Sequence, residues 1–236
     1  MIFQELDLQR IFIVWIAQGL IILIFLLLFI KILGRKRNRY SIIISMIYLL
    51  AAIGFFLNLI YVLLRDEMAI VILDFLMIYL ILIALVFVLL FNLNLLQTIQ
   101  IFTLKKQRIL FILYTIIIFV ALFYPMDTTV TANYAPLYSW TKFIIIVIFY
   151  TGAIMIPLLY TSILVYKKFE ADEMKKRWRF FIIGVIFFCV SFYNLVLYST
   201  WHDEMYQTVT GVILLLTVIT GGYFIYYGVG KSLSAD

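Results

Sequence analysis

Long apolar segments, separated by short clusters of charged and turn-forming residues, dominate the chain. A bilayer's hydrocarbon core needs about 20 apolar residues in helical form to be crossed. Seven segments approach or exceed this length, at residues 11–33, 40–64, 68–91, 109–124, 143–166, 180–200 and 208–228. Because they are continuously apolar rather than alternating, they favour helices over the strands of a membrane barrel. The pattern predicts an all-α, single-domain bundle of seven transmembrane helices.

The overall composition agrees with a membrane protein. Of the 236 residues, 67% are hydrophobic and 13% are charged, whereas soluble domains have about 45–50% apolar and about 25% charged residues. A soluble enzyme, a disordered chain and a nucleic-acid-binding module are therefore disfavoured, and the expected surroundings are a lipid bilayer. The first segment follows Glu5 and Asp7 and is too long for a signal-peptide core, so we expect it to remain as a helix.

The basic residues are distributed very unevenly between the two sides of the predicted bundle. Of the 18 Lys and Arg, all but Arg10, Arg65 and Lys142 fall on one side. Those 15 are Lys31, Arg35, Lys36, Arg37, Arg39, Lys105, Lys106, Arg108, Lys167, Lys168, Lys175, Lys176, Arg177, Arg179 and Lys231. Because Lys and Arg in short loops favour the cytoplasm, we predict a multi-pass cell-membrane protein with its amino terminus outside and its carboxyl terminus inside.

Aromatic residues gather in the connections on the opposite, outer side. Tyr134, Tyr138, Trp140 and Trp201 lie at the predicted membrane boundary, where aromatic side chains commonly form an interfacial belt. Contact with a ligand is the alternative role. The longest outer connection, 125–142, either covers the helix ends as a lid or is a plain loop.

Asp74 is the one carboxylate well inside a predicted span, and such a residue is a functional-site hypothesis because its insertion costs about 2.5–3.5 kcal/mol. Asn58 and Asp74 lie eight residues before and after Asp66, so antiparallel helices bring them to one depth. Other polar residues expected near that depth are Gln18, Tyr150, Thr151, Asn194 and, slightly deeper, Thr217. We predict that these seven residues line an outward-facing ligand pocket. The alternative is that they join neighbouring helices by hydrogen bonds.

Pro157 and the pair Gly221-Gly222 fall toward the inner ends of the fifth and seventh segments. Because Pro and Gly can kink a helix, these positions are candidate hinges. Both residue types are also ordinary in membrane helices.

Several signatures are missing from the sequence. The last segment has no central Lys for a retinal Schiff base, no Asp-Arg-Tyr triplet follows the third segment, and the last contains no Asn-Pro-x-x-Tyr. His202, the single histidine, has only Asp203 and Glu204 beside it, which is far short of a metal site. We therefore expect no enzymatic activity, no cofactor and no bound metal.

The last three segments carry a basic and aromatic pattern. Lys175-Lys176-Arg177-Trp178-Arg179 leads into Phe180, Phe181 and Gly184, and the last segment ends on Tyr223, Tyr226, Tyr227 and Gly228. This region resembles the seven-helix membrane sensor found at the amino end of many prokaryotic histidine kinases. In that family the last helix usually continues into an output domain, whereas residues 229–236 are all that follow here. The resemblance therefore implies a sensor that signals to a separate partner.

These observations predict an integral membrane sensor or receptor-like protein that binds a small ligand on its outer side. Its expected cytoplasmic signalling partner would contact the inner connection through Lys167, Lys168, Lys175, Lys176, Arg177 and Arg179. The alternative is a small transporter or channel in which Asp74 carries an ion or a proton. The oligomeric state is left open by the sequence.

Overall fold

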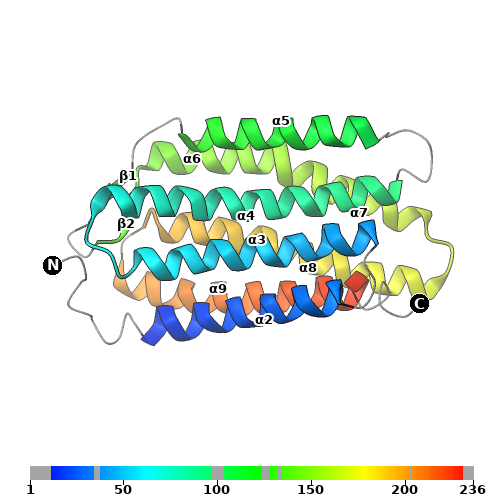
Figure 1. Ribbon diagram of the computed structural model, residues 1–236, viewed down its shortest axis with the longest axis horizontal. Helices are drawn as coiled ribbons and strands as arrows, with labels where there is room; N and C mark the ends of the chain where they lie inside the picture. The colour runs from blue at the N-terminus through cyan, green and yellow to red at the C-terminus, as the bar shows by residue number, and fades with distance from the viewer. Residues whose placement is uncertain are drawn as a thin grey trace.

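The computed structural model describes residues 12–34, 38–96, 104–123, 128–131, 134–201 and 203–230 (Figure 1). Its main helices are α2 (Ala17–Leu33), α3 (Arg39–Tyr61), α4 (Glu67–Leu96), α5 (Leu104–Phe123), α6 (Trp140–Phe149), α7 (Ile156–Lys168), α8 (Asp172–Tyr198) and α9 (Glu204–Ile225). Three π-helical segments extend or join them: η1 (Phe12–Ile16), η3 (Tyr150–Met155) and η4 (Tyr226–Gly230). Within the described residues, seven continuous helical spans are long and apolar enough to cross a membrane. The predicted all-α bundle is confirmed at this level, and the spans are those of a multi-pass membrane protein.

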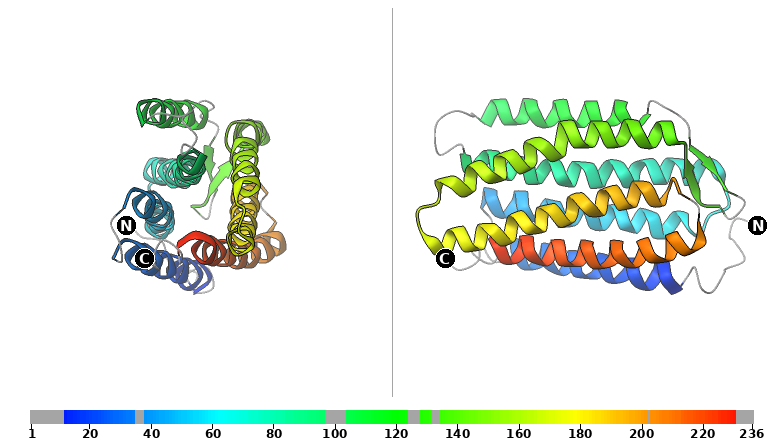
Figure 2. Two further views of the ribbon diagram at one scale, coloured as in Figure 1. Left: turned by 90° about the vertical axis from the view of Figure 1, so that its right-hand side faces the viewer. Right: turned by 180° about the vertical axis from the view of Figure 1, so that it is seen from behind.

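The helices form two layers that face each other along the bundle (Figure 2). One layer contains α5, α4, α3 and α2 in that order, and the other contains α6 with α7, then α8 and α9. Contacts between α2 and α9 close one side of the bundle, and α4 meets α7 across the middle. Large apolar side chains such as Phe25, Tyr48 and Phe192 fill the space between the layers.

Several helices continue past the apolar segments that predict them. The third runs over Glu67–Leu96 rather than 68–91, and the sixth begins at Asp172 rather than at residue 180. The polar start of α8 is helical because Asp172 and Glu173 favour a helix amino terminus, and because Glu173 forms an ion pair of 2.6 Å with Arg177 one turn later. The hydropathy pattern identifies only the part of a helix that suits lipid, whereas backbone hydrogen bonding continues the helix beyond that part.

The two candidate hinges have different surroundings in the structure. Pro157 is the second residue of α7 and lies just after the π-helical segment η3, which joins α6 and α7 within one span. Gly221 and Gly222 instead lie at tight contacts, because a Cβ atom would come within 2.7 Å of Phe188 at the first and of Phe25 at the second. The glycine pair therefore serves close helix packing, which small residues permit in membrane bundles.

The long connection before α6 contains a short β-hairpin at one end of the bundle. Strand β1 (Thr128–Val130) pairs antiparallel with β2 (Pro136–Tyr138), with Thr128 opposite Tyr138. The end view shows the hairpin between the two helix layers (Figure 2). We call this the hairpin end of the bundle. The opposite end, where α3, α5 and α8 begin, carries most of the Lys and Arg residues and is called the basic end.

Candidate functional site

Asp74 lies in the second turn of α4, and only 1% of its surface is exposed. Its Oδ2 atom accepts a short hydrogen bond from the hydroxyl of Tyr138, the last residue of β2. The other carboxylate oxygen, Oδ1, is buried and has no hydrogen-bond partner within the described residues. The hairpin thus supplies the one direct polar contact that the structure records for this carboxylate.

Lys142 brings a positive charge to the same place from the first turn of α6. It is 6% exposed, its Nζ atom donates a hydrogen bond to the Thr128 hydroxyl of β1, and it lies 4.2 Å from the centroid of the Tyr138 ring. Its charge also interacts with the Asp74 carboxylate, although the described residues show no direct ion pair between them. Tyr138 is therefore held between a buried anion and a buried cation.

The Tyr138 hydroxyl acts as the proton donor in its bond with Asp74. Burial, followed by the negative charge of Asp74, raises the pKa of Tyr138 well above its ordinary value. The backbone N–H of the same residue donates a hydrogen bond of 2.9 Å to the carbonyl oxygen of Ser199, at the end of α8. Tyr138 therefore connects α4 in one layer with α8 in the other.

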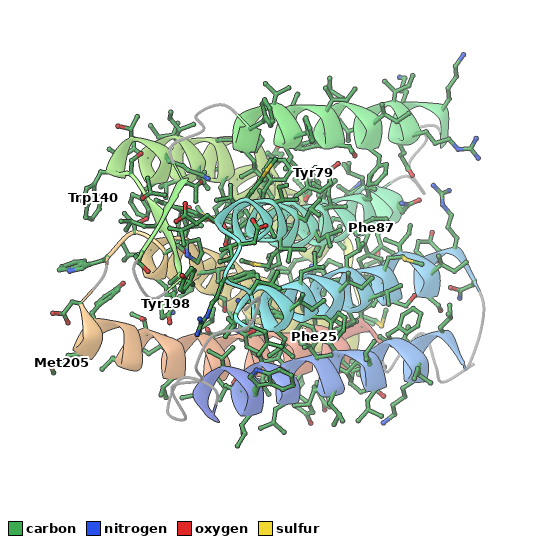
Figure 3. All side chains as sticks on the ribbon, turned by 60° about the vertical axis from the view of Figure 1, so that its left-hand side comes forward. Phe25, Tyr79, Phe87, Trp140, Tyr198 and Met205 are labelled. Carbon is green, nitrogen blue, oxygen red and sulfur yellow. The ribbon has the colours of Figure 1, made fainter. Side chains whose placement is uncertain are left out.

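This arrangement corrects the sequence-based assignment of Tyr138 to an interfacial belt. Tyr138 is only 3% exposed, whereas Trp140 and Trp201 are 56% and 51% exposed. Figure 3 shows Trp140, Tyr198 and Met205 at the hairpin end of the bundle. Lys142 was likewise expected to be an ordinary outer charge. Its position at the end of the predicted connection 125–142 gave no signal that it would be buried.

Asn58 is the predicted site residue whose depth matches that of Asp74. A Cβ atom on Gly54 would lie 3.3 Å from the carbonyl oxygen of Met77, so these two residues are neighbours across α3 and α4. Asn58 and Asp74 are each about one helical turn from that contact, toward the hairpin end. The structure records no hydrogen bond between their side chains, so equal depth does not make them partners.

The other predicted ligand-binding residues form separate contacts. The Asn194 amide donates a hydrogen bond of 2.8 Å to the Thr210 carbonyl oxygen and so joins α8 to α9. Thr217 accepts a 2.7 Å hydrogen bond from Ser191, and Thr151 lies 2.6 Å from the Tyr193 hydroxyl. Tyr150 is fully buried against the Phe192 ring, and the buried Gln18 Oε1 has no partner within the described part of the chain.

These residues therefore make separate contacts in the structure, and the shared ligand pocket stays a prediction. An internal cavity of about 40 Å³ lies between the layers, but its described lining is apolar apart from Ser191 and includes none of the seven residues. Four of them instead hold neighbouring helices together or pack in the core, which is the alternative that the sequence left open. Asp74 remains the residue with a distinctive environment.

The predicted partner-binding residues divide into exposed and engaged side chains. Lys167, Lys168 and Lys176 are exposed at the basic end, and Lys175 is partly buried. Arg177 pairs with Glu173, and Arg179 donates hydrogen bonds of 3.0 and 2.9 Å to the Tyr166 hydroxyl. The three exposed lysines and Arg179, which is also exposed, therefore form the accessible part of this surface.

A buried polar network near the basic end was missed by the sequence analysis. The Asn92 amide of α4 donates hydrogen bonds to the Thr161 and Ser162 hydroxyls of α7, at 3.2 and 2.7 Å. Trp178, which was expected in an inner loop, instead lies in α8 and is only 3% exposed. Its Nε1 atom donates a hydrogen bond of 2.8 Å to the Ser162 carbonyl oxygen. An amide inside the apolar run 90–96 was the available signal.

The chain matches no family model, and the search of curated proteins finds no relative. The resemblance to the membrane sensors of histidine kinases therefore stays a prediction. The described residues contain no group of His, Cys, Asp and Glu that is suited to hold a metal ion. The chemistry offered by the site is recognition by a buried carboxylate, a tyrosine hydroxyl and an ammonium group.

Proposed function

We propose that this chain is a sensor or receptor-like protein of the cell membrane that recognises a small ligand at the hairpin end. The observation that carries the proposal is the double attachment of Tyr138. Its hydroxyl is bonded to Asp74 in one helix layer, and its backbone N–H is bonded to Ser199 in the other. A ligand with a cationic or hydrogen-bond-donating group competes with Tyr138 for Asp74, and displacement of Tyr138 then changes both layers together.

Helix α8 provides the route for the signal to the other end. Its 27 residues extend for roughly 40 Å, from the Ser199 contact at the hairpin end to the basic end. There Trp178 is hydrogen-bonded to Ser162 of α7. A shift or rotation of α8 therefore moves the connection between α7 and α8, as in the small helix displacements used by many switching proteins.

In this proposal the hairpin end faces outside and the basic end faces the cytoplasm, as expected from the distribution of Lys and Arg. Lys167, Lys168 and Lys176 are exposed there and suit an acidic surface on a separate signalling protein. Without ligand, the hydrogen bond between Tyr138 and Asp74 keeps the sensor in its resting state. Ligand binding favours the state in which this bond is broken.

Hydrogen exchange in nanodiscs tests the coupling directly. Tyr138→Phe removes the hydroxyl but keeps the ring, so we expect faster exchange in residues 167–180 as well as in the hairpin. Tyr206→Phe is the matched control, because Tyr206 lies at the same end and its hydroxyl forms no hydrogen bond with the part of the chain that the structure describes. If Tyr138→Phe loosens the hairpin and leaves residues 167–180 unchanged, the proposed route through α8 is wrong.

A proton or ion transporter is the second candidate, favoured by the buried Oδ1 atom of Asp74, which has no hydrogen-bond partner among the described residues. The two functions separate in vesicles that contain the purified protein and a pH-sensitive dye. A transporter moves protons or solute by itself and loses this activity in Asp74→Asn. A sensor produces no flux, and we expect that result.

A further inference from the structure

A second cleft, of about 310 Å³, opens at the basic end between α3, α4 and α5. Its walls include Phe87 and Leu90 of α4 and Phe111 of α5, and its polar border includes Arg39 and Arg108. Phe87 is labelled on α4 in Figure 3. This volume is at the lower end of the range for ligand-binding pockets, so it suits part of a larger molecule.

The polarity of the cleft changes with depth along the helices. Arg39 is the first residue of α3, and Ile43 lies one turn further into the bundle on the same cleft. Arg108 lies near the start of α5, and Ile112 follows one turn deeper. A basic mouth with apolar walls below it has the same order of polarity as a phospholipid, whose charged headgroup is joined to an acyl chain.

Among the described residues, the two arginines of this mouth, Arg39 and Arg108, form no ion pair with a carboxylate. The described segments beside them, residues 38–40 and 104–109, also contain Lys105 and Lys106, but no Asp or Glu. Arg39 donates a hydrogen bond to the neutral Gln107, and the ion pair recorded among the described residues, Arg177 with Glu173, is elsewhere. The local charge therefore complements an anionic ligand.

One wall of the cleft is exposed toward the surroundings of the bundle. Ile112, which lines the cleft, is 57% exposed although it is large and apolar, and Ile109 of the same helix is 56% exposed. These side chains suit lipid chains rather than water. A soluble acidic protein would meet the basic mouth but not the apolar walls one turn deeper, so the whole surface fits a lipid better than a protein.

We propose that this cleft binds one anionic phospholipid, with its phosphate at Arg39 and Arg108 and the upper part of an acyl chain against Phe87, Leu90 and Phe111. The site is independent of the ligand site at the hairpin end. It fastens α5, which has few contacts with other helices, to α3 and α4.

Native mass spectrometry of the detergent-purified protein, titrated with phosphatidylglycerol or phosphatidylcholine, tests the proposal. We expect phosphatidylglycerol to be retained and phosphatidylcholine to be lost. Each basic residue near the membrane surface contributes about 1 kcal/mol to the binding of an anionic lipid. Arg108→Gln therefore weakens phosphatidylglycerol binding about fivefold, and the Arg39→Gln/Arg108→Gln variant weakens it roughly 25-fold. Arg108→Gln leaves the Arg39–Gln107 bond intact and therefore preserves the local fold.

Two matched controls separate a built site from general surface attraction. Lys175→Gln/Lys176→Gln removes the same charge at another place on the basic end, and we expect less than about a twofold change. Ile112→Trp obstructs the cleft and reduces binding, whereas Ile116→Trp, one turn away and 55% exposed, does not.

Equal losses in both charge variants, or in both Trp variants, would overturn the proposal, and so would equal retention of the two lipids. Glycerol phosphate serves as a competitor that carries the anion without the chain. If it displaces phosphatidylglycerol at similar concentration, the site binds an anion only and the proposed role of the acyl chain is wrong.

Discussion

The hydrogen bond between Tyr138 and Asp74 leads to a quantitative prediction. Tyr138→Phe keeps the ring above Lys142 and removes only the hydroxyl group. Asp74 then loses the one hydrogen bond recorded for it, since Oδ1 already has none within the described residues. The substitution leaves a buried carboxylate without a hydrogen-bond donor.

The expected loss follows from the charge and burial of the pair. Interhelical hydrogen bonds in membrane proteins contribute about 0.6 kcal/mol on average, but bonds to charged groups contribute about 1.5–3 kcal/mol. Because Asp74 and Tyr138 are 1% and 3% exposed, water cannot replace the lost donor. We expect Tyr138→Phe to lower the free energy of unfolding by about 2 kcal/mol.

A double-mutant cycle isolates this interaction from other effects. In the Asp74→Leu background, Tyr138→Phe has no carboxylate to affect, so its cost falls to about 0.5 kcal/mol and the coupling energy is about 1.5 kcal/mol. Reversible unfolding in mixed detergent and lipid micelles measures the four free energies. Tyr206→Phe is the control for loss of a tyrosine hydroxyl at the same end.

A coupling energy below about 0.5 kcal/mol would refute the reasoning. It would mean that Asp74 finds another donor at no cost, so that the hairpin does not hold the carboxylate. The competition between a ligand and Tyr138 would then have no energetic basis.

Three further predictions concern packing, the buried network and topology. A Cβ atom on Gly184 would lie 2.8 Å from backbone atoms of α9, so Gly184→Ala costs about 1–3 kcal/mol, whereas Gly211→Ala, with nothing within 4 Å, is neutral or slightly stabilising in the same unfolding assay. Asn92→Leu removes the hydrogen bonds between α4 and α7 and lowers the free energy of unfolding by about 1–2 kcal/mol, and an unchanged value would contradict the role of that network. For topology, a single cysteine at Ala171 is protected from an impermeant thiol reagent in intact cells and one at Asp203 reacts; the reverse pattern would invert the proposed orientation.

The hydropathy pattern predicts the seven spans because each helix has to satisfy its own backbone and match its own length to the hydrocarbon layer. Helix ends are less well predicted, since Asp172 to Arg179 form about two helical turns outside the apolar segment. The depth of a residue in the membrane can also be predicted from the sequence, because a short turn between antiparallel helices brings Asn58 and Asp74 to one level.

The composition of the candidate site is only partly contained in the chain pattern. Asp74 stands out because inserting a carboxylate into the membrane costs free energy whichever direction its helix face points. Tyr138 and Lys142 do not stand out, because they lie in the connection 125–142, and the position of its hairpin between the layers is a property of the tertiary structure. Trp178 does not stand out either, since a tryptophan beside four basic residues resembles a residue at the membrane boundary.

Local sequence by itself determines that this chain forms seven apolar helices, which residues are costly to bury, and at what depth each one lies. The tertiary structure decides which helices share a layer, which way each helix is rotated about its axis, and therefore which polar groups meet. The physical reason is that transfer into lipid depends on one segment at a time, whereas the Tyr138–Asp74 bond and the Asn92 network depend on groups more than 60 residues apart.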